Sequence, residues 1–132
     1  MERRNFLKNT GIASISAAGL LTASCNNSGE ALLASNQIQH GVIFCLKYEK
    51  NSVDAKNFLE DGRRILSAIP VVQNFQVFKQ VSPKNEFDYG FTMVFESMED
   101  YQTYNNHPDH VDFVENRWKK EVTEFLEIDF EV

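Results

Sequence analysis

The sequence predicts a single α+β domain in residues 37–132, with strands and helices in the order β-α-β-β-α-β. Three observations lead to this prediction. A chain of 132 residues has the length of one domain, and its hydrophobic share of 42% allows a core. Segments with the two-residue period of strands alternate with segments that have the three- and four-residue spacing of helices. The first strand is apolar on both faces, so both faces need a cover.

The first strand is predicted over residues 40–48, where apolar side chains occupy both the even and the odd positions. A helix follows, with Ser52 or Asp54 as its N-cap and Pro70 as its end. Its apolar residues recur at three- and four-residue steps, which places them along one side of the helix. They are Ala55, Phe58, Leu59, Gly62, Ile65, Leu66 and Ile69.

Two further strands are predicted over about residues 72–81 and 87–95, joined by a polar turn at residues 82–85. The first of these strands is predicted to have one face that is solvent-exposed or half-buried, because Phe75, Val77 and Val81 alternate with polar residues. The second gives the strongest strand pattern in the chain. Its aromatic and apolar residues share one face, and they are Phe87, Tyr89, Phe91, Met93 and Phe95.

Two helices and a last strand complete the domain. Ser97 is placed to cap a short helix that runs to about Asn106, and Pro108 begins the next helix at its favoured first-turn position. The apolar residues that this second helix is predicted to turn inward are Val111, Val114, Trp118 and Val122. In the last strand an apolar set alternates with Glu127, Asp129 and Glu131, and that set is Leu126, Ile128, Phe130 and Val132.

This order of elements is the ferredoxin-like arrangement, a four-stranded antiparallel sheet with helices on one face. No predicted helix remains to cover the other face of the sheet. A second copy of the sheet is the simplest cover, and two sheets that close on each other at a two-fold axis form a dimeric α/β barrel. We therefore expect a homodimer.

Residues 1–24 differ in composition from the rest of the chain. Arg3 and Arg4 precede Phe-Leu-Lys and a mildly apolar run that is too short and too rich in Ser, Ala and Gly to span a bilayer. The pattern resembles a twin-arginine export signal, although Glu2 stands where Ser or Thr is usual. We expect an exported protein at the cell envelope or in the periplasm.

Cys25 closes this segment in a stretch that resembles a lipoprotein cleavage box, with Thr22 where Leu is usual. The cysteine is predicted to carry a lipid anchor, and simple cleavage to a soluble protein is the alternative. Residues 25–36 are rich in Asn, Ser, Gly and Ala, which predicts a flexible tether. Cys45 is the other cysteine, and within an apolar strand it is predicted to be a small core residue.

The charge balance disfavours nucleic acid as a partner. Without the first 24 residues the chain keeps 10 basic and 18 acidic residues, and the basic ones are spread out or paired rather than gathered in a stripe. An acidic surface repels phosphate backbones, and no Lys/Arg cluster is present for anionic lipid. Contact with a membrane is therefore expected only through the lipid on Cys25.

The candidate site residues lie at the junction of the last two helices and at the start of the first strand. The chain has three histidines, and two of them, His107 and His110, follow Tyr104 in a Tyr-x-x-His-Pro-x-His stretch, while the third is His40. With the Ile-Pro that closes the first helix, an Asp-Tyr before the third strand, and Trp118, this pattern resembles the stress-responsive A/B-barrel (Dabb) family. The resemblance covers about residues 37–130 and implies the dimeric barrel fold.

The resemblance also implies a reaction. A plant cyclase of the family folds a polyketide without metal or cofactor, and its catalytic residues match Tyr104 and His110 here, with a further pocket histidine at His40. His110 would then be a general base for a carbon-bound proton beside a carbonyl, and Tyr104 would donate a hydrogen bond to the enolate oxygen. The residues expected to line the small-molecule pocket are Val42, Phe44, Phe58, Leu59 and His107.

Other interpretations stay open. Gly62 and Asn105 stand where the cyclase has an aromatic and an apolar residue, so the pocket here is expected to be wider and more polar. The histidines and Tyr104 can instead have structural roles, such as capping a helix, which would make the domain a non-catalytic dimeric stress-response or binding module. His40, His107 and His110 with Asp109 could also form a metal site, which the Pro108 break disfavours. We expect no metal and no cofactor.

Overall fold

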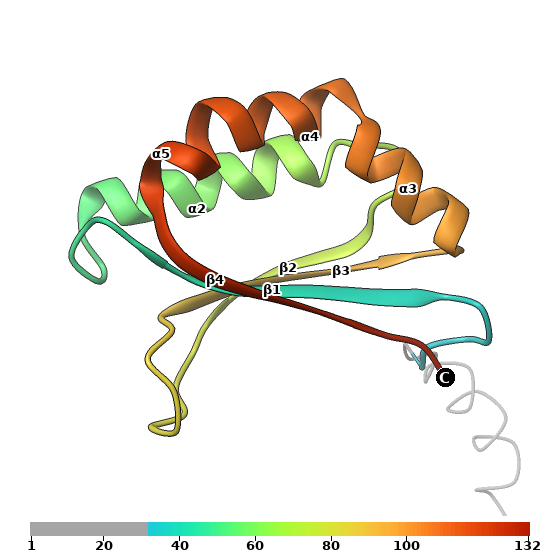
Figure 1. Ribbon diagram of the computed structural model, residues 1–132, viewed down its shortest axis with the longest axis horizontal. Helices are drawn as coiled ribbons and strands as arrows, with labels where there is room; N and C mark the ends of the chain where they lie inside the picture. Colours follow the sequence, from blue (N-terminus) through green and yellow to red (C-terminus); the bar gives the residue numbers. More distant parts are fainter. Residues whose placement is uncertain (1–31) are drawn as a thin grey trace, which may run out of the picture. The chain divides into compact units, whose positions relative to one another are not determined.

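In the computed structural model, which describes residues 32–132, four strands form one antiparallel sheet with helices on one face (Figure 1). The strands are β1 (Ile38–Leu46), β2 (Gln73–Lys79), β3 (Tyr89–Phe95) and β4 (Val122–Phe130), arranged in the order β2-β3-β1-β4. The helices are α2 (Val53–Leu66), α3 (Met98–Asn106), α4 (Pro108–Phe113) and α5 (Lys119–Glu121), with the π-helix η1 (Val114–Trp118) between the last two. The predicted α+β class and element order are confirmed.

The described residues include a compact unit over Leu33–Val132. The predicted signal segment, Cys25 and most of the predicted tether lie outside them. No helix within residues 32–132 is long and apolar enough to cross a membrane.

The predicted helix starts are confirmed by their capping contacts. The Ser52 hydroxyl accepts a hydrogen bond from the backbone N–H of Ala55, and the Ser97 hydroxyl accepts one from Asp100. Pro108 is the first residue of α4, and the preceding His107 caps that helix by accepting from the N–H of Asp109. Each cap pairs a backbone donor that the helix itself leaves without a partner.

Two strand predictions need correction. Val81 was predicted to lie inside the second strand, but β2 ends at Lys79 and Val81 is 89% exposed. The Gln80 side chain bonds the backbone carbonyl oxygen atoms of Ser82 and Phe87, which turns the chain before Val81 can pair. β4 begins at Val122 rather than near Leu126, and its pairing with β1 shifts register between Cys45 and Leu46.

The helix after Pro108 differs from its predicted pattern because it contains a π-helical turn. Val111 is 45% exposed, and the residue that packs into the core is Phe113. A π-helix adds a residue to the turn, so one α-helical spacing cannot describe residues 108–121. Val122, predicted as the last inward residue of this helix, is the first residue of β4.

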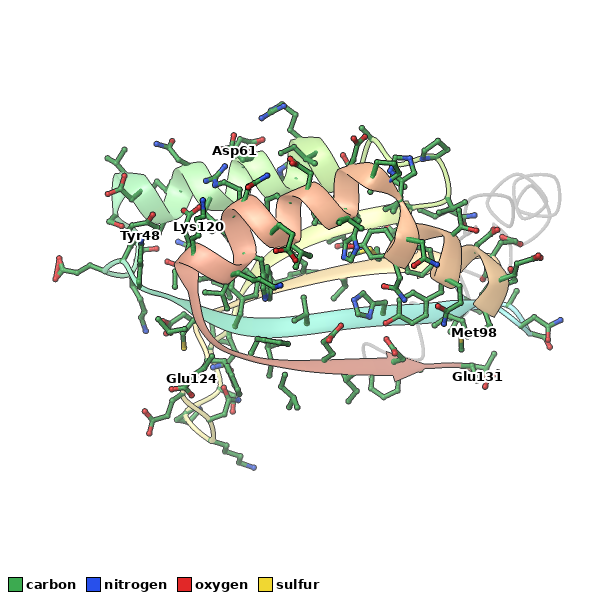
Figure 2. All side chains as sticks on the ribbon, turned by 45° about the horizontal axis from the view of Figure 1, so that its top comes forward. Tyr48, Asp61, Met98, Lys120, Glu124 and Glu131 are labelled. Carbon is green, nitrogen blue, oxygen red and sulfur yellow. The ribbon has the colours of Figure 1, made fainter. Side chains whose placement is uncertain are left out.

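The core lies between the helices and the sheet and is largely aromatic (Figure 2). Phe44 of β1 contacts Phe91 of β3 edge-on, with ring centroids 4.9 Å apart, and Phe58 of α2 stacks near them. Trp118 of η1 packs on Phe44, with ring centroids 4.9 Å apart. These contacts tie α2 and η1 to the two central strands.

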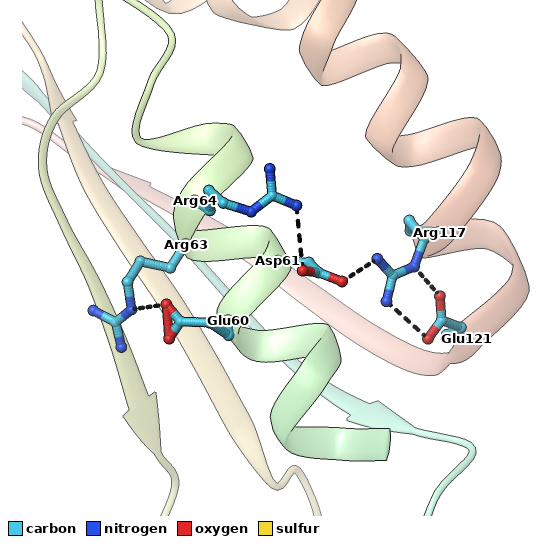
Figure 3. A network of polar contacts seen from close by, with 6 residues as sticks. All are labelled: Glu60, Asp61, Arg63, Arg64, Arg117 and Glu121. Carbon is cyan, nitrogen blue, oxygen red and sulfur yellow. Dashed lines mark hydrogen bonds and ion pairs between the residues drawn. The ribbon is translucent and has the colours of Figure 1, made fainter. Parts of the chain in front are cut away.

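A polar network on the outside of the helices joins α2 to the segment that leads into β4 (Figure 3). Arg117 of η1 donates to Asp61 of α2 at 2.6 Å and to Glu121 of α5. Arg64 also donates to Asp61, and the Tyr48 hydroxyl donates to Glu121. Hydrogen bonds from Arg117 lower the pKa of Asp61, and the pKa of Glu121 falls too because these bonds outweigh its burial.

The sheet face that points away from the helices carries apolar side chains that stay exposed. Leu126, Ile128 and Phe130 of β4 lie on this face, and so does Phe78 of β2, the strand at the opposite edge of the sheet. A shallow hollow of about 210 Å³ crosses this face, lined among others by Ile43 and Ile128. Within residues 32–132 no helix covers this face (Figure 1).

Candidate active site

A pocket of about 350 Å³ lies between the helices and the sheet, on the side where α3, α4 and η1 approach β1 and β4. Most of its lining is apolar, and its polar groups come from five elements of the fold, namely β1, α3, α4, α5 and β4. The lining residues are His40, Val42, Leu66, Phe91, Met93, Tyr104, Asn105, His110, Phe113, Val114, Trp118, Lys119, Phe125 and Glu127. A mostly apolar cavity with a few convergent polar groups is the usual form of a small-molecule site.

His110 enters the pocket from the first turn of α4. Its Nδ1 lies 3.1 Å from the backbone carbonyl oxygen of Asn105, which can only accept, so Nδ1 carries the proton and Nε2 keeps its lone pair. Burial lowers the pKa of His110. The imidazole therefore stays neutral, and able to take up a proton, to a lower pH than a free histidine does.

Tyr104 lies beside His110, with ring centroids 4.2 Å apart, and is 3% exposed. Burial raises the pKa of Tyr104, with the nearby Tyr101 and Glu127 adding to the effect. The phenol therefore stays protonated near neutral pH and can donate. Among the hydrogen bonds of residues 32–132, none involves the Tyr104 hydroxyl, which is thus available to a ligand in the pocket.

His40 of β1 is 4% exposed and is held by two side chains at its Nδ1 atom. Oδ1 of Asp129 lies 2.6 Å from Nδ1, and the Tyr101 hydroxyl lies 2.9 Å from it. The same hydroxyl donates to the Asp129 carboxylate at 3.1 and 3.2 Å. Because the carboxylate accepts from Nδ1, the other ring nitrogen, Nε2, is left for the pocket, where Glu127 lies 3.8 Å away.

Comparison with known proteins identifies the family. Residues 38–132 match the family described as Stress responsive A/B Barrel Domain, or Dabb. The chain belongs to the Dabb family. A crystal structure of a Dabb family protein with a ferredoxin-like fold from Mesorhizobium loti is 47% identical in sequence, and the match covers 73% of this chain and 96% of that chain with a TM-score of 0.72. A comparison with curated proteins gave no match.

More distant structures share the fold of this Dabb domain. A dimeric protein of unknown function with a ferredoxin-like fold from Bacteroides fragilis is 20% identical, covers 74% of this chain and 98% of its own, and has a TM-score of 0.57. The hydroxynitrile lyase from Passiflora edulis is 12% identical in sequence. The match covers 75% of this chain and 95% of that chain, with a TM-score of 0.65. The fold thus occurs both in an enzyme and in a protein without an assigned role.

The Dabb domain brings four of the predicted site residues together and leaves the others outside the pocket. Tyr104, His110, His40 and Val42 all line it. Phe44 and Phe58 do not, because both are fully buried in the aromatic core beneath it. Leu59 packs against the edge of that core, and His107 caps α4 with its ring outside the lining.

Sequence reasoning missed Tyr101, Glu127 and Asp129. The alternation in the last strand does not show which face points inward, and the structure turns the acidic face toward the helices and the apolar set outward. One signal could have found Asp129. Antiparallel pairing of the first and last strands places His40 directly opposite Asp129, and directly opposed residues share a face of the sheet.

Of the two residues expected to widen the pocket and make it more polar, Asn105 lies in the wall and Gly62 does not. Asn105 does line the pocket and adds a polar group beside Tyr104. Gly62 adds no free space, because the Phe91 ring fills the place a side chain would take: a Cβ atom on Gly62 would lie 2.7 Å from Cζ of Phe91. Across residues 32–132, no group of three or more His, Cys, Asp or Glu is arranged to hold a metal ion.

Replacing Gly62 with alanine is expected to destabilise the domain by about 1–2 kcal/mol, although alanine is the better helix former. The added methyl group must displace the Phe91 ring, which lines the pocket, so the pocket should also shrink. Urea denaturation would measure the stability. Asn57→Ala on the exposed side of α2 is the control, and equal stability changes for the two variants would contradict the prediction.

Proposed function

We propose that this Dabb domain is exported, forms a homodimer, binds a small hydrophobic carbonyl compound and catalyses proton transfer on it without a cofactor. The observation that carries the proposal is the pairing of two side chains at one pocket. His110 presents an unprotonated nitrogen and Tyr104 an unengaged phenol, 4.2 Å apart by ring centroids, above an apolar cavity. A base and a hydrogen-bond donor at one carbonyl group are the two parts that enolisation requires.

His110 would act as the general base. Nδ1 is fixed by the Asn105 carbonyl oxygen, so Nε2 is the atom that takes the proton from the carbon next to the ligand carbonyl. The electron pair of that C–H bond moves into the new carbon–carbon double bond, and negative charge develops on the carbonyl oxygen. Return of the proton from Nε2 to another carbon completes an isomerisation. In a cyclisation the enolate carbon instead bonds to a second carbonyl carbon of the same ligand, whose C=O π electrons move to its oxygen, and that oxygen takes the proton from Nε2.

Tyr104 would stabilise the oxygen on which that charge develops. Its raised pKa keeps the hydroxyl proton in place, so it supports the oxyanion as a donor and not as an acid that ionises first. The surrounding apolar residues, among them Phe113 and Val114, exclude water and so strengthen the hydrogen bond.

The pocket also supports the second candidate, a non-catalytic module that binds a small molecule at the cell envelope. The cavity is wide enough for a ligand of about ten non-hydrogen atoms whether or not chemistry follows. Native mass spectrometry of the protein from its own host separates the candidates by what co-purifies. A bound compound with an acidic C–H beside a carbonyl supports catalysis, and one without such a group supports binding alone.

Replacing Tyr104 with phenylalanine is expected to slow enolisation by about 100-fold, since one oxyanion donor is lost while the ring stays in place. Uptake of deuterium by β-keto esters, measured by NMR with the uncatalysed exchange subtracted, gives the rate. The matched control is Tyr48→Phe, which removes a phenol hydroxyl bonded to Glu121, away from the pocket. Equal rates for the two variants would remove Tyr104 from the mechanism.

A further inference from the structure

The pocket has a second pair of polar side chains, which come from the sheet and not from the helices. His40 reaches it from β1 and Glu127 from β4, two neighbouring strands of the sheet, whereas Tyr104 and His110 come from the helices. Nε2 of His40 and Oε1 of Glu127 lie 3.8 Å apart. This distance is too long for a direct hydrogen bond between them.

The His40 ring cannot turn its other nitrogen to the pocket without losing contacts. Nδ1 is bonded to Asp129 at 2.6 Å and lies 2.9 Å from the Tyr101 hydroxyl, which itself donates to Asp129. Tyr101 and Asp129 are thus positioning residues for the ring. They fix Nε2 as the atom that faces Glu127 and the cavity.

We propose that His40 and Glu127 form a subsite for a hydroxyl group of the ligand, so that the compound bound here is an uncharged hydroxy-carbonyl compound. A ligand hydroxyl can donate its proton to the Glu127 carboxylate, and its oxygen can accept from Nε2 of His40 when both ring nitrogen atoms carry a proton. An oxygen atom about 2.8 Å from each atom fits between two atoms that are 3.8 Å apart. The carbonyl group would then meet Tyr104 and His110.

Negative charge near His40 disfavours ligands that carry a carboxylate. Glu127 contributes its negative charge to the pocket, and Asp129 lies just behind His40. The cation that lines the pocket, Lys119, is already paired with Glu115 at 2.6 Å. A ligand carboxylate at the His40 end would therefore meet like charge, while a neutral hydroxyl would not.

The test compares probes that differ by one group. Binding of acetophenone, 3-hydroxyacetophenone and 4-hydroxyacetophenone to the full chain at pH 6.5 is measured by ligand-observed NMR. At least one hydroxylated probe is expected to bind five-fold or more tightly than acetophenone, and 3-hydroxybenzoate is expected to bind more weakly than acetophenone. Equal affinities for all three ketones, or no binding of any of them at millimolar concentration, would overturn the subsite.

Variants on β4 locate the effect. Glu127→Leu should abolish the preference for the hydroxyl group, and Glu127→Gln, which keeps a donor and an acceptor, should retain part of it and improve binding of 3-hydroxybenzoate. The matched control is Glu124→Leu on the same strand, outside the pocket lining, which should leave the preference unchanged. A preference that survives Glu127→Leu overturns the proposal.

The proposed subsite rests on the proposed function, because the same pocket must hold the ligand. The subsite and the catalytic function can nevertheless fail separately. If β-keto esters exchange protons in a Tyr104-dependent way while the hydroxyl preference is absent, only the subsite is wrong. If the hydroxyl preference depends on Glu127 while no exchange depends on Tyr104, the subsite stands in a binding module.

Discussion

Replacing His110 with alanine is expected to lower the rate of enolisation by about 10²- to 10⁴-fold, the range for loss of a general base. The variant should still bind ketone probes, because Tyr104 and the apolar wall remain. Deuterium uptake by β-keto esters gives the rate, and ligand-observed NMR gives the affinity. A loss of rate at unchanged affinity is the result that marks a base.

The pH dependence provides an independent check on His110. Burial lowers its pKa, so the neutral base should persist below the ordinary imidazole value of roughly 6.5. The rate should therefore fall with decreasing pH only through an apparent pKa below that value. The control is His107→Asn, which removes an imidazole outside the pocket and keeps an N-cap acceptor on α4. An acid limb at or above 6.5 would speak against a buried base.

Replacing Ile128 with aspartate is expected to weaken the proposed homodimer by about 100-fold or more. Ile128 is 47% exposed on the uncovered face of the sheet, beside the hollow that Ile43 also lines. In a two-fold interface each substitution occurs on both partners, so two unpaired carboxylates would be buried in apolar surroundings. Sedimentation velocity at several protein concentrations would measure the dissociation.

The control for this variant is Val111→Asp, which places the same charge on an apolar residue that is about equally exposed but lies on α4. It should leave the oligomeric state unchanged. Circular dichroism of both variants separates dissociation from unfolding. A wild-type protein that sediments as a monomer, or an Ile128→Asp variant that remains a dimer, would refute an interface on this face.

Much of the fold followed from local patterns whose physics is short-ranged. Ser52, Ser97 and Pro108 mark helix starts because the capping contacts involve neighbours three residues away or less. The third strand was predicted well because its aromatic and apolar side chains share one face. The π-turn at Val114–Trp118 was not predictable in this way, because the spacing of the apolar residues does not mark an inserted residue, and Arg117 of this turn bonds Asp61, which lies 56 positions away.

The site was predicted only where the family resemblance provided residues. Tyr104, His110 and His40 were expected together, and the structure places all three at one pocket. Glu127 and Asp129 were not predicted as site residues, because an alternating strand does not show which of its faces points inward. The usual assumption places the apolar face in the core, and it does not hold for a sheet whose other face is also apolar.

The bond between His40 and Asp129 joins residues that are 89 positions apart, and it crosses from a central strand to an edge strand. Edge strands open more easily than the centre of a sheet, so partial fraying of β4 would remove Glu127 and Asp129 from the pocket while the aromatic core stays folded. The same strand carries Ile128 on its opposite face. Anything that binds this outer face would therefore hold β4 closed and increase the fraction of molecules with a complete pocket.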